Sequence, residues 1–144
     1  MARGPTNGGD AEAGAGHAAG LSVLVVDDEP VIRAEVARGL TLAGMDVAVA
    51  AGGREALRLV ADDRVRPAVV VTDIEMPAMT GIELAARLLA LRPALRIPGH
   101  HHDPERAEAA RRHPSIVDRV LVKPIRLDDL VDAVRPAAGR APVG

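Results

Sequence analysis

Residues 21–30 read Leu21-Ser22-Val23-Leu24-Val25-Val26-Asp27-Asp28-Glu29-Pro30, an apolar run that ends abruptly in three carboxylates. A nearly continuous apolar run of this length is typical of a strand that is buried on both faces of a parallel sheet. Pro30 suits the first turn of a helix, and carboxylates are favourable close to a helix N-terminus. The stretch therefore predicts a buried strand that leads directly into a helix.

The same pattern recurs along the chain. Further strand candidates lie at 46–51, 67–72, 94–99 and 117–122, and an amphipathic helix candidate follows each of them. The helix after the third strand begins with the capping box Thr80-Gly81-Ile82-Glu83. The unit at 94–99 is the weakest, because Arg96 and Pro98 are poor residues for an interior strand. The repeated βα units predict an α/β fold, a doubly wound (βα)5 sandwich around a five-stranded parallel sheet.

Length and composition restrict the domain count and the class of protein. A chain of 144 residues predicts one domain, which we place at residues 21–136, between a flexible leader at 1–20 and a flexible tail at 137–144 that are rich in Gly and Ala. The absence of cysteine excludes disulfides and thiolate metal sites. No apolar run approaches the roughly 18 residues that a membrane-spanning helix needs. We therefore expect a cytoplasmic protein without a membrane partner.

Charge and aromatic content argue against direct binding of nucleic acid. The formal net charge of −2 offers no basic surface for a phosphate backbone. Phe, Tyr and Trp are all absent, so no aromatic ring can stack on a base. We expect no direct contact with nucleic acid.

Four charged residues follow strand candidates at their carboxyl ends: Asp27 and Asp28 after the first, Asp73 after the third and Lys123 after the fifth. Each alone is an ordinary capping or turn residue, but right-handed crossovers bring all these strand ends to one edge of the sheet, where ligands bind. Clustered carboxylates repel one another unless a hard cation such as Mg²⁺ lies among them. A carboxylate beside Mg²⁺ and a lysine can accept a phosphoryl group as an aspartyl phosphate.

These residues give the chain a resemblance to the receiver domains of two-component response regulators, the CheY-like family. The resemblance covers about 21–135 and is carried by Val23–Glu29, Thr72–Pro77, Gly81–Leu84 and Leu121–Pro124. It implies the flavodoxin-like strand order 2-1-3-4-5. It also implies a module that accepts a phosphoryl group from a histidine kinase or phosphotransfer protein and signals to a downstream protein. We expect a single-domain response regulator, which is no enzyme beyond its self-phosphorylation and slow autodephosphorylation.

The resemblance also implies roles for individual residues. Asp73 would be the phosphoacceptor, and Lys123 would contact the phosphoryl oxygens and form a cis bond to Pro124. The Mg²⁺ ligands would be Asp28 and Asp73 directly, Asp27 through water, and the backbone carbonyl of Glu75.

Two positions depart from the pattern of the family. Its members carry Ser or Thr at the end of the fourth strand, where residues 97–103 of this chain contain no hydroxyl, and Tyr or Phe at the position of Val120. We expect His100–His102 to form a solvated loop, because three consecutive side chains do not converge on a metal. A hydrogen bond from one of them at the phosphoryl site is the other interpretation.

Two other functions remain open. The departures favour a pseudo-receiver, a binding module that acts without phosphorylation, whereas the presence of Asp27, Asp28, Asp73 and Lys123 argues against it. A phosphatase of the haloacid-dehalogenase kind ranks last, because that family has Asp-x-Asp after the first strand and here the two aspartates are adjacent.

Overall fold

The computed structural model describes residues 20–113 and 119–135. The expected leader, apart from Gly20, and the expected tail lie outside this part of the chain. Strands and helices alternate in the order β2 (Ser22–Val26), α1 (Pro30–Leu42), β3 (Asp46–Ala50), α2 (Gly53–Ala61), β4 (Val69–Asp73), α3 (Gly81–Leu91), β5 (Gly99–His101), α4 (Pro104–Ala110), β6 (Val120–Val122) and α5 (Leu127–Val134).

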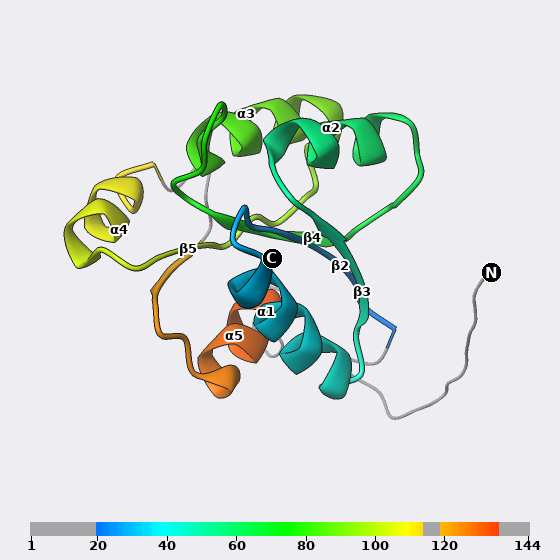
Figure 1. Ribbon diagram of the computed structural model, residues 1–144. Helices are drawn as coiled ribbons and strands as arrows, with labels where there is room; N and C mark the ends of the chain where they lie inside the picture. Colours follow the sequence, from blue (N-terminus) through cyan, green and yellow to red (C-terminus); the bar gives the residue numbers. More distant parts are fainter. Residues whose placement is uncertain (1–19, 114–118, 136–144) are drawn as a thin grey trace, which may run out of the picture.

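The strands form one five-stranded parallel sheet with the order β3-β2-β4-β5-β6. Counted along the described chain, this is the predicted order 2-1-3-4-5, and the α/β fold class is confirmed. Helices α2 and α3 lie on one face of the sheet and α1 and α5 on the other, while α4 lies at the side of β5 (Figure 1).

Residues of β2 alternate between two apolar cores, one on each face of the sheet. Val23 and Val25 pack with residues of α1 and α5. Leu24 and Val26 pack with residues of α2, α3 and α4. Because both faces of the strand are covered, its sequence is continuously apolar rather than alternating.

The fourth strand lies further along the chain than predicted. Within the expected strand at 94–99, Arg96 forms an isolated bridge to Val69. The regular pairing of β5 with β4 begins at Gly99. The Arg96 guanidinium instead donates hydrogen bonds to carbonyl oxygens at the end of α5, at 2.9 Å from Val134 and 3.0 Å from Ala133. The sequence therefore predicts a strand in this part of the chain correctly, but the paired residues are Gly99–His101 and not 94–99.

The expectation of a solvated loop at His100–His102 is wrong for two of the three residues. His100 and His101 belong to β5 and have exposed fractions of 0% and 1%, whereas His102 is exposed. The strand at 117–122 is observed as Val120–Val122, and residues 117 and 118 lie outside the described part. No helix among the described residues is long and apolar enough to cross a membrane.

Candidate phosphoryl-acceptor site

An acidic cluster lies at the carboxyl ends of the central strands. Asp27 and Asp28 follow β2, and Asp73 is the last residue of β4. One ligand oxygen from each of these three side chains lies within 4.8 Å of the others. Asp27 is fully buried and Asp73 is 4% exposed, so the cluster is set into the sheet edge and not spread over the surface.

Backbone amides hold the two buried carboxylates in place. The Glu29 amide donates to Asp27 Oδ1 at 2.9 Å, and the Glu75 amide donates to Asp73 Oδ1 at 3.2 Å. Each bond runs from the amide two residues further along, the geometry of an Asx turn. This arrangement leaves the second oxygen of each carboxylate to face other groups.

The ammonium of Lys123 faces these second oxygens. Its Nζ lies 3.4 Å from Asp27 Oδ2, 3.5 Å from Asp73 Oδ2 and 3.7 Å from Glu29 Oε1. The backbone fixes the position of Lys123, because its amide donates to the His101 carbonyl at 2.8 Å. The bond from Lys123 to Pro124 is cis, as the resemblance implies.

The electrostatic environment disfavours the charge of the carboxylates. Burial raises the pKa of Asp73 from 3.8 to about 6, although the Lys123 ammonium opposes the shift. Burial likewise raises the pKa of Asp27, against the Glu29 amide and Lys123. A hard cation would relieve this cost, and carboxylate oxygens are the protein ligands that Mg²⁺ takes.

Beside this cluster lies the buried imidazole of His100. His100 is the register partner of Asp73 in the pairing of β4 with β5. Its Nε2 is 3.7 Å from Asp27 Oδ2, beyond hydrogen-bond distance, and neither ring nitrogen has a hydrogen-bond partner among the described residues. Burial, followed by Lys123 and His101, lowers the pKa of the imidazole to about 3, so the ring is neutral.

A second polar network joins the loops after β4 and β5. His101 Nδ1 accepts from the Asp103 amide at 2.8 Å, so its Nε2 carries the proton and donates to Glu75 Oε1 at 3.2 Å. Arg106 of α4 also contacts this carboxylate, and Arg106 and His101 together lower the pKa of Glu75. The segment that follows Asp73 is thereby tied to the start of α4.

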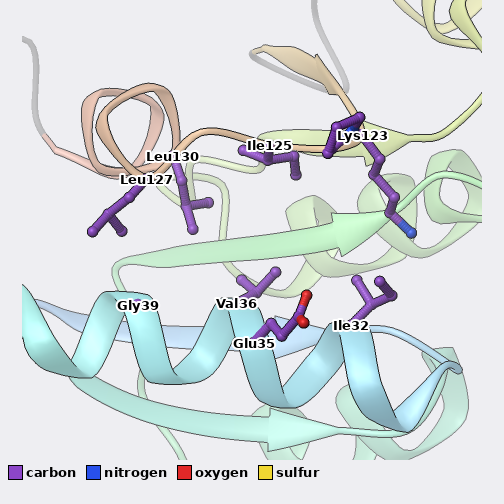
Figure 2. Close-up of a pocket in the computed structure, with 9 residues that line it drawn as sticks. Ile32, Glu35, Val36, Gly39, Lys123, Ile125, Leu127 and Leu130 are labelled. Atoms are coloured by element: carbon purple, nitrogen blue, oxygen red, sulfur yellow. The ribbon is translucent and has the colours of Figure 1, made fainter.

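An apolar groove runs between α1 and α5 (Figure 2). It encloses about 250 Å³ and is lined mainly by aliphatic side chains, including Ile32, Val36 and Leu130. Lys123 and Pro124 also line it, so the lysine that faces the carboxylates borders the groove as well.

Sequence reasoning found most but not all of this site. Asp27, Asp28, Asp73 and Lys123, predicted to converge, do lie together. The liganding role of the Glu75 carbonyl stays a prediction. The placement of His100 was missed, yet a signal was present. The signal is the helix start at Asp103-Pro104. A strand at 99–101 needs only a short loop to reach the start of that helix.

Comparison with known proteins gives consistent matches. The family model of the response regulator receiver domain matches residues 23–135. The positive alginate biosynthesis regulatory protein of Pseudomonas aeruginosa is 39% identical over 124 residues, which are 82% of this chain and 47% of that protein. The response regulator MprA of Mycolicibacterium vanbaalenii is 34% identical, over 80% of this chain and 49% of its own length. The chain thus spans about half the length of these curated relatives.

Solved structures agree with this family match. A response regulator receiver protein from Pseudomonas putida is similar with a TM-score of 0.70 and 34% identity, covering 82% of this chain and 98% of that one. The response regulator protein TrrA from Thermotoga maritima, solved in complex with Mg²⁺-BeF, has a TM-score of 0.69 and 30% identity, covering 78% of this chain and 95% of that one.

Proposed function

The chain belongs to the response regulator receiver domain family, and from that premise we propose that it accepts a phosphoryl group on Asp73 from a histidine kinase or phosphotransfer protein. The phosphorylated form then signals to a downstream protein. The observation that carries this proposal is the convergence of three carboxylates and the Lys123 ammonium at one edge of the sheet. Receiver domains are signalling modules, and we assign this chain no turnover of a separate substrate.

The donor set of the site fits a magnesium ion. Asp27, Asp28 and Asp73 offer carboxylate oxygens within 4.8 Å of one another, and we add the Glu75 carbonyl as a fourth protein group, as in the family pattern. When bound, Mg²⁺ supplies positive charge that offsets the negative charge of the phosphoryl oxygens. Burial of the carboxylates favours its uptake, because their charge is poorly compensated without it.

The chemistry assigned to Asp73 is a nucleophilic displacement at phosphorus. An oxygen of Asp73 attacks the phosphorus of the phosphohistidine, and the P–N bond breaks as the new O–P bond forms. The electron pair of the broken bond returns to the imidazole nitrogen of the donor, which takes up a proton. The Glu75 amide holds Oδ1, so Oδ2, 3.5 Å from Lys123 Nζ, is the oxygen we assign to the attack.

Lys123 has the complementary task of balancing charge. Its ammonium lies within 3.5 Å of both buried aspartates, close enough to meet the oxygens of the incoming phosphoryl group. Phosphoryl transfer depends mainly on such positioning and charge neutralisation. No proton transfer by Lys123 is needed for the balance of this step.

Intact-mass measurement after incubation with Mg²⁺ and acetyl phosphate tests the proposal. We expect the parent protein to gain one phosphoryl group and Asp73→Asn to gain none. Asp46→Asn, which changes an exposed aspartate at the start of β3, is the matched control and should gain mass like the parent.

Two results together would contradict the proposal. These are no mass gain in the parent and no Mg²⁺ binding by isothermal titration. That pair would favour a pseudo-receiver that binds its partners without phosphorylation.

A further inference from the structure

His100 is placed to face the same ligand as Asp73. The two residues are partners in the parallel register of β4 and β5, and paired residues of neighbouring strands project to the same face of a sheet. The 3.7 Å approach of His100 Nε2 to Asp27 Oδ2 puts the imidazole beside the acidic cluster. The ring therefore borders the space in which Asp73 would carry a phosphoryl group.

The imidazole of His100 is fully buried, yet neither of its nitrogens has a hydrogen-bond partner in the described ranges. Native proteins satisfy nearly all buried polar groups, so an unsatisfied one calls for a functional explanation. The neighbouring His101 is equally buried but has both nitrogens paired, with the Asp103 amide and with Glu75. The lack of partners is thus specific to the histidine at the acidic site.

The chemistry of the ring indicates the kind of ligand it would take. An imidazole offers at least one N–H donor in either protonation state, and the ammonium of Lys123 lies at the same acidic cluster. An anion rich in oxygen acceptors, held close to the same ammonium, would accept the unused N–H. A phosphoryl group on Asp73 has this chemistry.

We propose that His100 is a phosphoryl-binding residue, whose imidazole N–H donates a hydrogen bond to an oxygen of the phosphoryl group on Asp73. The inference rests on the proposed phosphorylation of Asp73. No bond to His100 forms or breaks, and the ring serves where the fourth strand has no hydroxyl. Through this contact, phosphorylation of Asp73 acts directly on a residue of β5.

Imidazole NMR of the full chain tests the contact directly. Addition of Mg²⁺ and beryllofluoride, a mimic of the bound phosphoryl group, should shift the ring nitrogen resonances of His100. Those of His113, which is exposed and lies beyond α4, should stay in place. The spectrum of His100→Gln assigns the His100 signals by their loss.

Variants give a second and quantitative readout through the dissociation constant for beryllofluoride, followed by fluorine NMR in the presence of Mg²⁺. His100→Leu fills the space without a donor and should weaken binding on the order of tenfold, the effect of one hydrogen bond to a charged group. His100→Gln keeps an N–H donor and should bind within about threefold of the parent. His113→Ala, at an exposed position beyond α4, is the control and should bind like the parent.

The results that overturn the inference differ from those that overturn the proposed function. If the parent gains a phosphoryl group by mass but its His100 signals do not shift, or a folded His100→Leu binds beryllofluoride as tightly as the parent, the His100 contact is wrong and the function stands. If the parent gains no mass and binds no Mg²⁺, the function itself fails. Should His100→Leu not fold, the NMR spectrum of the parent still decides.

Discussion

Asp73 combines deep burial with a charge that the folded protein does not fully compensate. Its folded pKa of about 6 lies above the ordinary value of 3.8, so protonated Asp73 fits the fold better than ionised Asp73. The contribution that protonation of Asp73 makes to the free energy of unfolding is fully present below pH 3.8 and is lost as pH rises through about 6. Without Mg²⁺, this residue therefore destabilises the protein at neutral pH.

Asp73→Asn should consequently stabilise the metal-free protein at pH 7 and have little effect at acidic pH. Between pH 4 and pH 7 the advantage of the variant in free energy of unfolding should grow by on the order of 2 kcal/mol. Urea unfolding in the presence of EDTA at both pH values measures it. Asp46→Asn, at an exposed site, should show no comparable growth, and an Asp73→Asn advantage independent of pH would contradict the argument.

Single residues at this site were predictable where their position in a strand sets their surroundings. Asp27, Asp73 and Lys123 each follow or end an apolar run, and the common direction of parallel strands brings such residues together. His100 could not be placed in the same way, because a run of three histidines has neither strand nor helix periodicity. The register of β5 with β4, which pairs His100 with Asp73, is a tertiary property.

At the scale of elements, the start of α3 is packed tightly against the end of β4. The capping box of Thr80 and Glu83 fixes the first turn, and the Gly81 amide donates to the Ile74 carbonyl at 2.7 Å. A Cβ on Gly81 would lie 2.3 Å from the Asp73 carbonyl oxygen and 2.9 Å from Ile74 Cα. Only glycine allows the helix to approach the end of β4 this closely.

Gly81→Ala should therefore push α3 away from Asp73. We expect a loss of about 1–3 kcal/mol in the free energy of unfolding, as for other overpacked sites, together with weaker Mg²⁺ binding. Urea unfolding and calorimetric Mg²⁺ titration measure the two effects. A Cβ at Gly52 meets nothing within 4 Å, so Gly52→Ala is the matched control. Its cost should stay below about 1 kcal/mol, and equal effects of both variants on Mg²⁺ binding would refute the explanation.

Elements with a clear apolar period were the ones that the sequence predicted well. The stripe containing Val36 and Leu40 marks the buried side of α1, and the capping box marks the start of α3. β5 was misplaced because its residues are Gly-His-His, whose burial depends on pairing and not on hydrophobicity. Arg96 lay in the predicted strand, but its guanidinium is used at the carbonyl end of α5.

At the scale of the whole molecule, the strands of the sheet are paired over unequal lengths. β2 has five register pairs with β3 and four with β4, and its residues from Val23 to Val26 are almost completely buried. β5 has only two register pairs with β4, and α4 buries only Ala107 and Ala110. Alanine contributes little apolar area, so β5 and α4 are packed less extensively against the rest of the domain than β2 is.

Hydrogen exchange should reflect this difference in packing. In the metal-free protein, we expect amides of α4 to exchange at least about 100-fold faster than those of β2, because local opening there exposes few apolar contacts. Exchange followed by NMR for individual amides gives the comparison, with α3 as a better-packed helix of the same protein. Protection of α4 equal to that of β2 would show that the packing argument fails.

Binding of Mg²⁺ and beryllofluoride at the acidic site should reduce the difference in amide exchange rate between α4 and β2. Asp73 is paired with His100, and the adjoining His101 is bonded to Glu75 and to the amide of Asp103 at the start of α4. A ligand that orders the end of β4 therefore also restrains the loop that leads into α4. With Mg²⁺ and beryllofluoride present, exchange should slow more in α4 than in α2, which lies outside this network. Equal slowing of both helices would indicate general stabilisation by ligand binding and not transmission through β5.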